Sequence, residues 1–137
     1  MRKIFSPDSP YKIQARSLAI LWTLLIFIAC FLPGEEIPQV AVPEADKWTH
    51  IILFGGFTFL WLCSRPIRTA ASLLGLFFIA VALGAFIEIM QGQLVFLGRS
   101  MEFLDGVADA IGGALGIGFF CLLAWFATRK TTGAVSP

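Results

Sequence analysis

Charged residues are scarce in this sequence. Only 14% of its 137 residues are Asp, Glu, Lys or Arg, whereas 58% are hydrophobic, and its mean hydropathy is +0.84. A typical soluble domain carries about 25% charged residues, so the composition excludes an ordinary soluble fold and predicts one integral membrane domain. The basic residues form no stripe along the chain, which excludes a nucleic-acid-binding protein.

Cysteine is also scarce, and the three cysteines show no metal-ligand spacing. We expect Cys30, Cys63 and Cys121 to be small buried side chains. Cys30 raises one alternative, because a basic start followed by an apolar run and "IAC" could be a lipoprotein signal cleaved before this cysteine. Phe27 fits such a signal poorly, and the residues after Cys30 stay apolar. An uncleaved first helix is therefore favoured.

Long apolar runs are what the sequence has in abundance. Four of them are visible, at about 17–32, 48–63, 69–90 and 104–127. A membrane-spanning helix needs about 20 residues, and a chain in lipid must satisfy its own backbone hydrogen bonds. The sequence therefore predicts an all-α membrane protein built as a four-transmembrane-helix bundle.

The charges between the apolar runs predict how the helices are oriented. Lys and Arg dominate the N-terminal tail, the turn at 64–68 and the C-terminal tail, whereas 33–47 carries four acids and one Lys. Because Lys and Arg are retained on the cytoplasmic side, we predict that both termini are cytoplasmic. The expected organisation is a basic tail at 1–16, a membrane domain at 17–127 and a second tail at 128–137.

This topology brings distant polar residues to one depth near the outer face of the membrane. The second span begins there, the third ends there and the fourth begins there. Polar residues inside a membrane are costly and are a functional-site hypothesis by default. The candidate ligand-binding residues are Asp46, His50, Glu88, Gln91, Arg99, Asp105 and Asp109.

Helical spacing predicts where these side chains point. Asp46 and His50 are four residues apart and share a face. The third span aligns small and polar residues on one face: Ala80, Gly84, Glu88 and Gln91. The fourth does the same with Asp105, Asp109, Gly112 and Gly116. Because a G-x-x-x-G pattern allows close helix contact, we expect both acidic faces to point at neighbouring helices rather than at lipid.

Several of these residues also have a structural explanation. Asp105 suits the first turn of a helix, where the helix dipole favours an acid. Asp46 and Lys47 could be a solvated pair at the water boundary, Gln91 an interfacial residue and Arg99 a loop cation that reaches toward the interface. Asp109 lies past the first turn, so the helix dipole explains its presence poorly. The four tryptophans are expected to face lipid or the membrane interface: Trp22, Trp48, Trp61 and Trp125.

The motifs "DKWTH" at 46–50, "EIMQ" at 88–91, "GRS" at 98–100 and "LDGVADAIGGALG" at 104–116 occur in this order. Together they resemble the VanZ-like family of small bacterial membrane proteins, over about 40–127. Many members of that family carry Asn where this chain has Asp109. The resemblance implies a multi-pass protein of the bacterial inner membrane with a cell-envelope role, linked to resistance to glycopeptide antibiotics such as teicoplanin. It supplies no reaction.

Three functions are compatible with these residues. The first is an accessory envelope protein that binds an anionic lipid-linked or peptidoglycan-derived ligand through Arg99. The second is a membrane-embedded enzyme whose candidate catalytic residues are His50, Glu88 and Asp109, with His50 and Glu88 as acid–base partners. The third is a proton- or cation-coupled carrier, although the inner half of the helices lacks polar residues. The lipid bilayer is an expected partner.

Cofactor use and assembly are less constrained by the sequence. No cofactor is expected, and a divalent metal bound by His50, Glu88, Asp105 or Asp109 is an alternative that no recognised metal-binding spacing supports. A homo-oligomer is also an open alternative.

Overall fold

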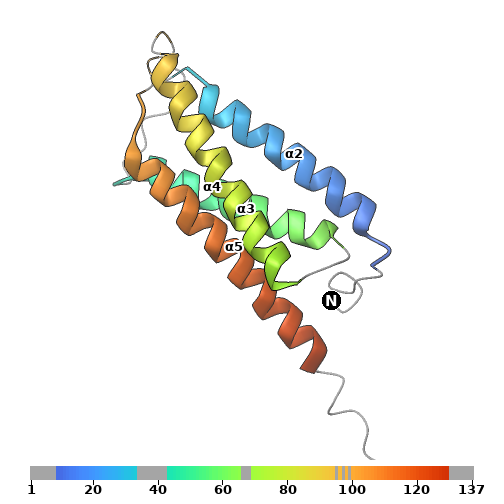
Figure 1. Cartoon of the computed structure of the whole chain (residues 1–137). Coiled ribbons are helices and arrows are strands. Elements are labelled where there is room, and N and C mark those ends of the chain that lie inside the picture. The colour runs from blue at the N-terminus through green and yellow to red at the C-terminus, as the bar shows by residue number, and fades with distance from the viewer. Residues whose placement is uncertain are drawn as a thin grey trace, which may run out of the picture.

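The computed structural model describes residues 9–33, 43–65, 69–94, 96, 98 and 100–129. The described residues contain four long helices and no strands: α2 (Lys12–Phe31), α3 (Ala45–Ser64), α4 (Ala70–Gln93) and α5 (Phe103–Arg129). The prediction of an all-α chain is therefore confirmed. Consecutive helices run in opposite directions, so the end of α2, the start of α3, the end of α4 and the start of α5 lie at one end of the bundle (Figure 1).

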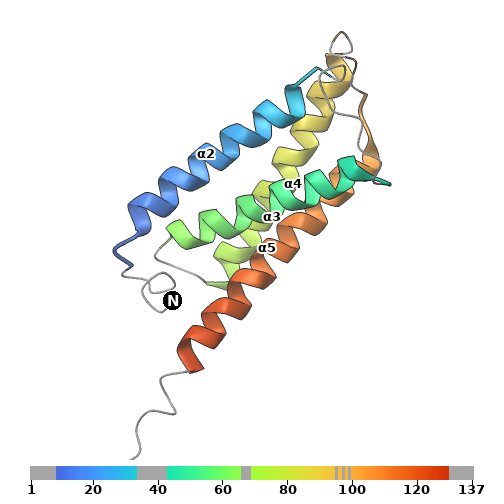
Figure 2. The same ribbon diagram turned by 180° about the vertical axis from the view of Figure 1, so that it is seen from behind.

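Helix α3 is the central element. It packs mainly against α5 and secondly against α2, while α4 packs mainly against α5 (Figure 2). The apolar core lies between these helices and includes Ile26, Phe54, Leu62, Leu76 and Phe120. α3 consequently has protein on two sides, and eight of its 20 residues are buried.

Three helices are long and apolar enough to cross a membrane: α2, α4 and Phe103–Ala127 of α5. The predicted span at 48–63 forms α3 but is not among these three. α3 starts with Asp46, Lys47 and His50, which lower its hydropathy. Length and composition alone thus support a helical membrane protein without establishing four spans.

The helices extend beyond the predicted apolar runs. α2 already begins at Lys12, inside the predicted tail at 1–16, and α5 continues to Arg129. An apolar run indicates the part of a helix in hydrocarbon, whereas the helix itself can continue into the polar region of the bilayer.

The prediction for the tryptophans is wrong at two of four positions. Trp22 donates a 2.8 Å hydrogen bond from Nε1 to the Leu53 carbonyl, and Trp61 donates from Nε1 to Thr23 Oγ1 at 3.2 Å. Both rings therefore join α2 to α3. An indole in an apolar interior needs a partner for its N–H, and the neighbouring helix supplies it. Trp48 and Trp125 are exposed, as predicted.

Candidate functional site

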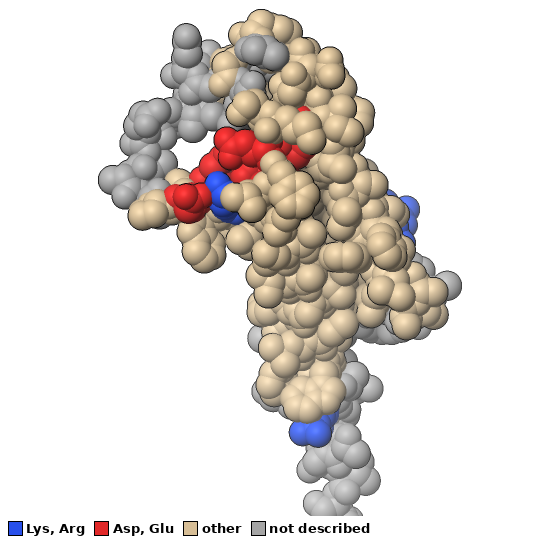
Figure 3. Space-filling model, turned by 60° about the vertical axis from the view of Figure 1, so that its left-hand side comes forward, with Lys and Arg blue, Asp and Glu red and all other residues tan. Residues whose placement is uncertain are grey.

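The acids of the described chain gather at one end of the bundle, which we call the polar end. All six described Asp and Glu residues lie at the start of α3 or α5, in the residue directly before one of these helices, or near the end of α4. The space-filling view shows an acidic area at this end of the molecule, with a basic side chain beside it (Figure 3). Five predicted site residues lie here and are called the acid–histidine cluster: Asp46, His50, Glu88, Asp105 and Asp109.

A buried pair joins α3 to α5 within this cluster. His50 Nδ1 lies 2.8 Å from Asp109 Oδ1, and the two residues are 3% and 0% exposed. An ionised carboxylate only accepts hydrogen bonds, so with Asp109 ionised the Nδ1–H of His50 donates. This bond fixes the imidazole ring and turns Nε2 toward the rest of the cluster.

Glycines make this close approach sterically feasible. A Cβ at Gly84 of α4 would collide with the carboxylate of Asp109, and a Cβ at Gly112 of α5 would collide with the backbone carbonyl of Ile51. One turn further, a Cβ at Gly116 would strike the carbonyl of Gly55. The predicted close contact at Gly112-x-x-x-Gly116 is confirmed, and α3 is the helix that makes it.

The second nitrogen of His50 faces Asp105. His50 Nε2 lies 4.0 Å from Asp105 Oδ2, and Asp105 is 4% exposed although it belongs to the first turn of α5. This distance is too long for a hydrogen bond. In a neutral imidazole whose Nδ1 carries the hydrogen, Nε2 is an acceptor. Two acceptors therefore face each other across this gap.

Three buried carboxylate oxygens have no hydrogen-bond partner among the described residues: Glu88 Oε1, Asp105 Oδ1 and Asp109 Oδ2. Leaving a buried polar atom unsatisfied costs about 1–3 kcal/mol, and more when it is charged. Such a concentration of unpaired acceptors indicates a place where a proton, a cation or a ligand donor is bound.

Glu88 connects the end of α4 to the chain that leads into α5. Its Oε2 accepts a 2.7 Å hydrogen bond from the backbone N–H of Glu102. Asp109, rather than Glu88, is the hydrogen-bond partner of His50, and the acid–base role of Glu88 stays a prediction. Glu88 lies near the end of α4, where the backbone preceding α5 is within reach of its side chain, and it also interacts electrostatically with His50.

Lys47 is a basic side chain beside the cluster. Its Nζ lies 2.5 Å from Glu44 and 4.0 Å from Glu102. The hydrogen bond to Glu44 raises the pKa of Lys47, which precedes the apolar part of α3, so the ammonium stays charged. Glu102 is an exposed acid that faces Lys47 and lies three residues before Asp105 in the sequence.

Two predicted site residues are not part of the described cluster. Gln91 is buried, but its Nε2 donates a 2.7 Å hydrogen bond to the Cys30 carbonyl, so it ties α4 to the end of α2. Arg99 lies outside the described residues. The predicted faces of α4 and α5 are otherwise confirmed, because Ala80, Gly84, Glu88 and Gln91 are all buried, as are Asp105, Asp109, Gly112 and Gly116.

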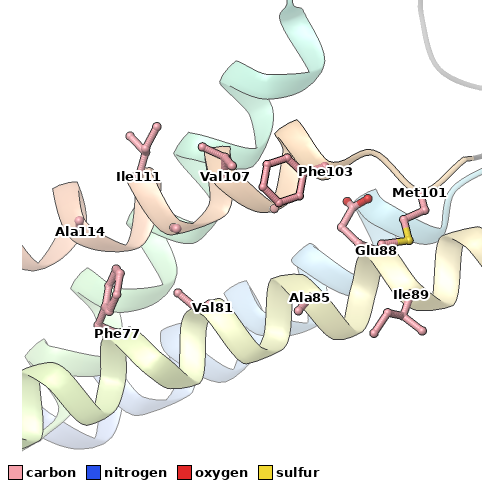
Figure 4. Close-up of a pocket in the computed structure, with 12 residues that line it drawn as sticks. Phe77, Val81, Ala85, Glu88, Ile89, Met101, Phe103, Val107, Ile111 and Ala114 are labelled. Atoms are coloured by element: carbon pink, nitrogen blue, oxygen red, sulfur yellow. The ribbon is translucent and has the colours of Figure 1, made fainter.

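An apolar groove of about 550 Å³ runs between α4 and α5 and reaches the cluster. Its lining includes small residues such as Ala85, Gly106, Ala110 and Ala114. Glu88 lies at one end of it, near Met101, while Phe77 and Ala114 lie at the other (Figure 4). We call this the α4–α5 groove. The buried carboxylate of Glu88 thus belongs both to the acid–histidine cluster and to the α4–α5 groove.

This arrangement has three chemical capacities. The His50–Asp109 pair can move a proton, because a carboxylate that fixes one imidazole nitrogen leaves the other as a base or acid. The unpaired oxygens can coordinate a cation. The groove can hold a hydrocarbon chain.

No protein-family model, curated protein or solved structure matches this protein sequence.

Proposed function

We propose that this chain is a multi-pass protein of the bacterial inner membrane that binds an amphipathic, lipid-linked envelope ligand. All four helices span the bilayer, both termini are cytoplasmic and the polar end faces outward. The distribution of Lys and Arg between the loops supports this orientation. The resemblance of "DKWTH", "EIMQ", "GRS" and "LDGVADAIGG" to the VanZ-like family supports an envelope role connected with glycopeptide resistance.

One observation carries the proposal: Glu88 belongs to both the polar cluster and the apolar groove. A lipid-linked ligand has a polar head joined to a hydrocarbon chain. The α4–α5 groove accepts the chain along the bilayer core, and the acid–histidine cluster meets the head at the membrane surface. A water-soluble ligand would have no use for the groove.

The charge of the ligand constrains how its head is bound. The described part of the cluster is acidic, with Lys47 at its margin. An anionic head, such as a phosphate, therefore needs a cation between itself and the carboxylates. Arg99 is the cation that the sequence offers, because a guanidinium can bind phosphate through two parallel hydrogen bonds.

The groove is tested by filling it. Ala85 and Ala82 are both exposed on α4, but only Ala85 lines the groove. We expect Ala85→Trp to abolish cross-linking of a polyprenyl phosphate with a photoreactive tail, while Ala82→Trp leaves the cross-linking yield unchanged. Mass spectrometry of the labelled peptides should place the wild-type cross-links on α4 and α5. Equal yields in both variants, or labels spread evenly over all four helices, would overturn the proposal.

The His50–Asp109 hydrogen bond favours a second candidate, an enzyme that acts on the bound ligand. In that case His50 acts as general acid or base, with Asp109 rather than Glu88 as its partner. The same polyprenyl phosphate separates the two candidates. Chemical turnover that disappears in His50→Gln while cross-linking persists would establish the enzyme, and intact ligand after prolonged incubation would exclude it for this substrate.

A further inference from the structure

We propose that Asp46, His50 and Asp105 form a binding site for a divalent transition-metal cation, with Asp109 as the residue that orients His50. The inference deepens the proposed function, because such an ion would supply the positive charge that an anionic head needs in an acidic cluster. Coordination itself requires no lipid, so it can be tested separately.

The three side chains converge from two helices. Each offers one ligand atom, and these atoms all lie within 4.8 Å of one another. Asp46 and His50 come from the first turns of α3, and Asp105 comes from the first turn of α5. The metal would thus bind where the two most closely packed helices begin, on a rigid framework rather than on a loop.

The spacing suits two ligands on one ion better than a direct hydrogen bond. Ligand atoms lie about 2.0–2.2 Å from a small divalent metal, so two of them can be up to about 4.4 Å apart. The 4.0 Å between His50 Nε2 and Asp105 Oδ2 falls within this range. Asp46 is exposed, so rotation of its side chain can bring its carboxylate to the same ion.

The second nitrogen of His50 is already arranged as in metal sites. Metal-binding histidines usually donate their other N–H to a carboxylate, which fixes the ring orientation and raises its basicity. In this protein the carboxylate is that of Asp109, whose Oδ1 lies 2.8 Å from His50 Nδ1. Asp109 is fully buried, and Asp105 faces the other ring nitrogen, Nε2. This gives Asp109 a role that Asn can partly fulfil, since an amide oxygen also accepts from Nδ1–H.

The unpaired oxygens are an independent indication of a bound cation. Asp105 Oδ1 has no hydrogen-bond partner among the described residues, and Asp105 as a whole is 4% exposed. Asp109 Oδ2 and Glu88 Oε1, also buried and unpaired, lie in the same cluster. One proton can satisfy one of these oxygens, whereas a divalent ion and its bound water can neutralise two charges and serve several oxygens at once.

The donor set indicates the class of metal. An imidazole with carboxylates suits Zn²⁺ or Mn²⁺ better than Mg²⁺ or Ca²⁺, which prefer oxygen ligands alone. Three protein ligands would leave coordination positions for water or for a phosphate oxygen. The proposed ion would therefore bridge the carboxylates and an anionic lipid head.

The test uses full-length protein, purified in detergent without added lipid and treated with a chelator. Binding of Mn²⁺ is measured by the loss of the free-ion electron paramagnetic resonance signal, and binding of Zn²⁺ by calorimetry. We expect one ion per chain. Asp105→Asn and His50→Ala should weaken binding more than the 10- to 100-fold typical of outer-shell changes, and Asp109→Asn by about that range.

Glu102→Gln is the matched control. Glu102 is an exposed acid next to Lys47, and its contact with Glu88 uses the backbone N–H rather than the side chain. We expect the affinity of the Glu102→Gln variant for Mn²⁺ and Zn²⁺ to stay within about threefold of wild type, which is a change in binding free energy below about 1 kcal/mol. Helical circular dichroism of each variant establishes that the protein remains folded.

Two results would overturn the metal site: no Mn²⁺ or Zn²⁺ bound by the wild type at millimolar concentration, or binding equally weakened by Glu102→Gln and Asp105→Asn. Neither result depends on lipid. If the metal binds as expected but Ala85→Trp leaves lipid cross-linking intact, the proposed lipid ligand fails and the metal site stands. If lipid binds without metal and requires Arg99, the guanidinium is the bridging cation instead.

Discussion

Two faces of α5 contrast sharply. One face carries Asp105, Asp109, Gly112 and Gly116 and is buried, chiefly against α3. The other carries Val107, Ala110, Ile111 and Ala114 and lines the open α4–α5 groove. Both faces contain small residues. The difference teaches that small residues permit close packing, but that a partner backbone at the right distance decides whether the space is closed.

The largest effect should come from forcing the closed face apart. A side chain at Gly116 would meet the Gly55 carbonyl and Thr58 Oγ1, which cannot both move aside. We expect Gly116→Leu to destabilise the fold by about 3 kcal/mol or more, at the upper end of overpacking effects. Unfolding in mixed micelles by a denaturing detergent measures this loss.

Gly118 provides the control for that change. It lies on the same helix, and nothing is within 4 Å of a Cβ built there. Gly118→Leu should leave the midpoint of unfolding unchanged or raise it slightly, because glycine is a poor helix former. Equal losses at both positions would show that the α3–α5 contact is not specifically close-packed.

The next effect should come from removing the acid that holds His50. Asp109→Ala leaves the buried Nδ1–H without its acceptor, so we expect a loss of about 1–3 kcal/mol in the free energy of unfolding. Asp109→Asn should retain most of that stability, because its amide oxygen still accepts. The same unfolding assay, applied to both variants, tests the assignment of Nδ1 as donor. A larger loss of stability in Asp109→Asn than in Asp109→Ala would contradict this assignment.

The smallest effect concerns a neutral hydrogen bond on the closed face. Thr58 Oγ1 donates to the carbonyl of Gly113 on α5 at 3.0 Å, and it also lies 3.3 Å from two carbonyls of its own helix. Thr58→Val keeps the shape and removes the donor. Hydrogen bonds between membrane helices contribute about 0.6 kcal/mol on average, so we expect a loss of that size. A loss above 2 kcal/mol would indicate that the hydroxyl does more than join the two helices.

Much of the candidate site could be predicted from sequence, for a physical reason. Helix direction alternates along a chain of antiparallel helices, so residues at the start of α3, the end of α4 and the start of α5 must share one end of the bundle. Helical periodicity also placed Glu88 with Gly84, and Asp109 with Gly112, on buried faces. The first inference depends only on the order of consecutive antiparallel helices, and the second only on the periodicity within single helices.

The pairing of side chains could not be predicted in this way. The choice of Asp109 rather than Glu88 as the partner of His50 depends on how far α3 and α5 approach each other and how each is rotated. Gln91 illustrates the same limit, since its position suggested the site but its amide bonds to the Cys30 carbonyl of α2. Trp22 and Trp61 were expected to face lipid or the membrane interface and instead donate hydrogen bonds between α2 and α3.

The sequence by itself determined that the chain is helical and apolar and that the described acids collect at one end, because hydropathy, helical period and the order of the helices along the chain can be read without knowing how the helices pack. Only the tertiary structure decided which acid orients His50, which oxygens stay unpaired and where the groove opens. Those features depend on distances between helices, and these are set by the glycines at which one backbone meets another.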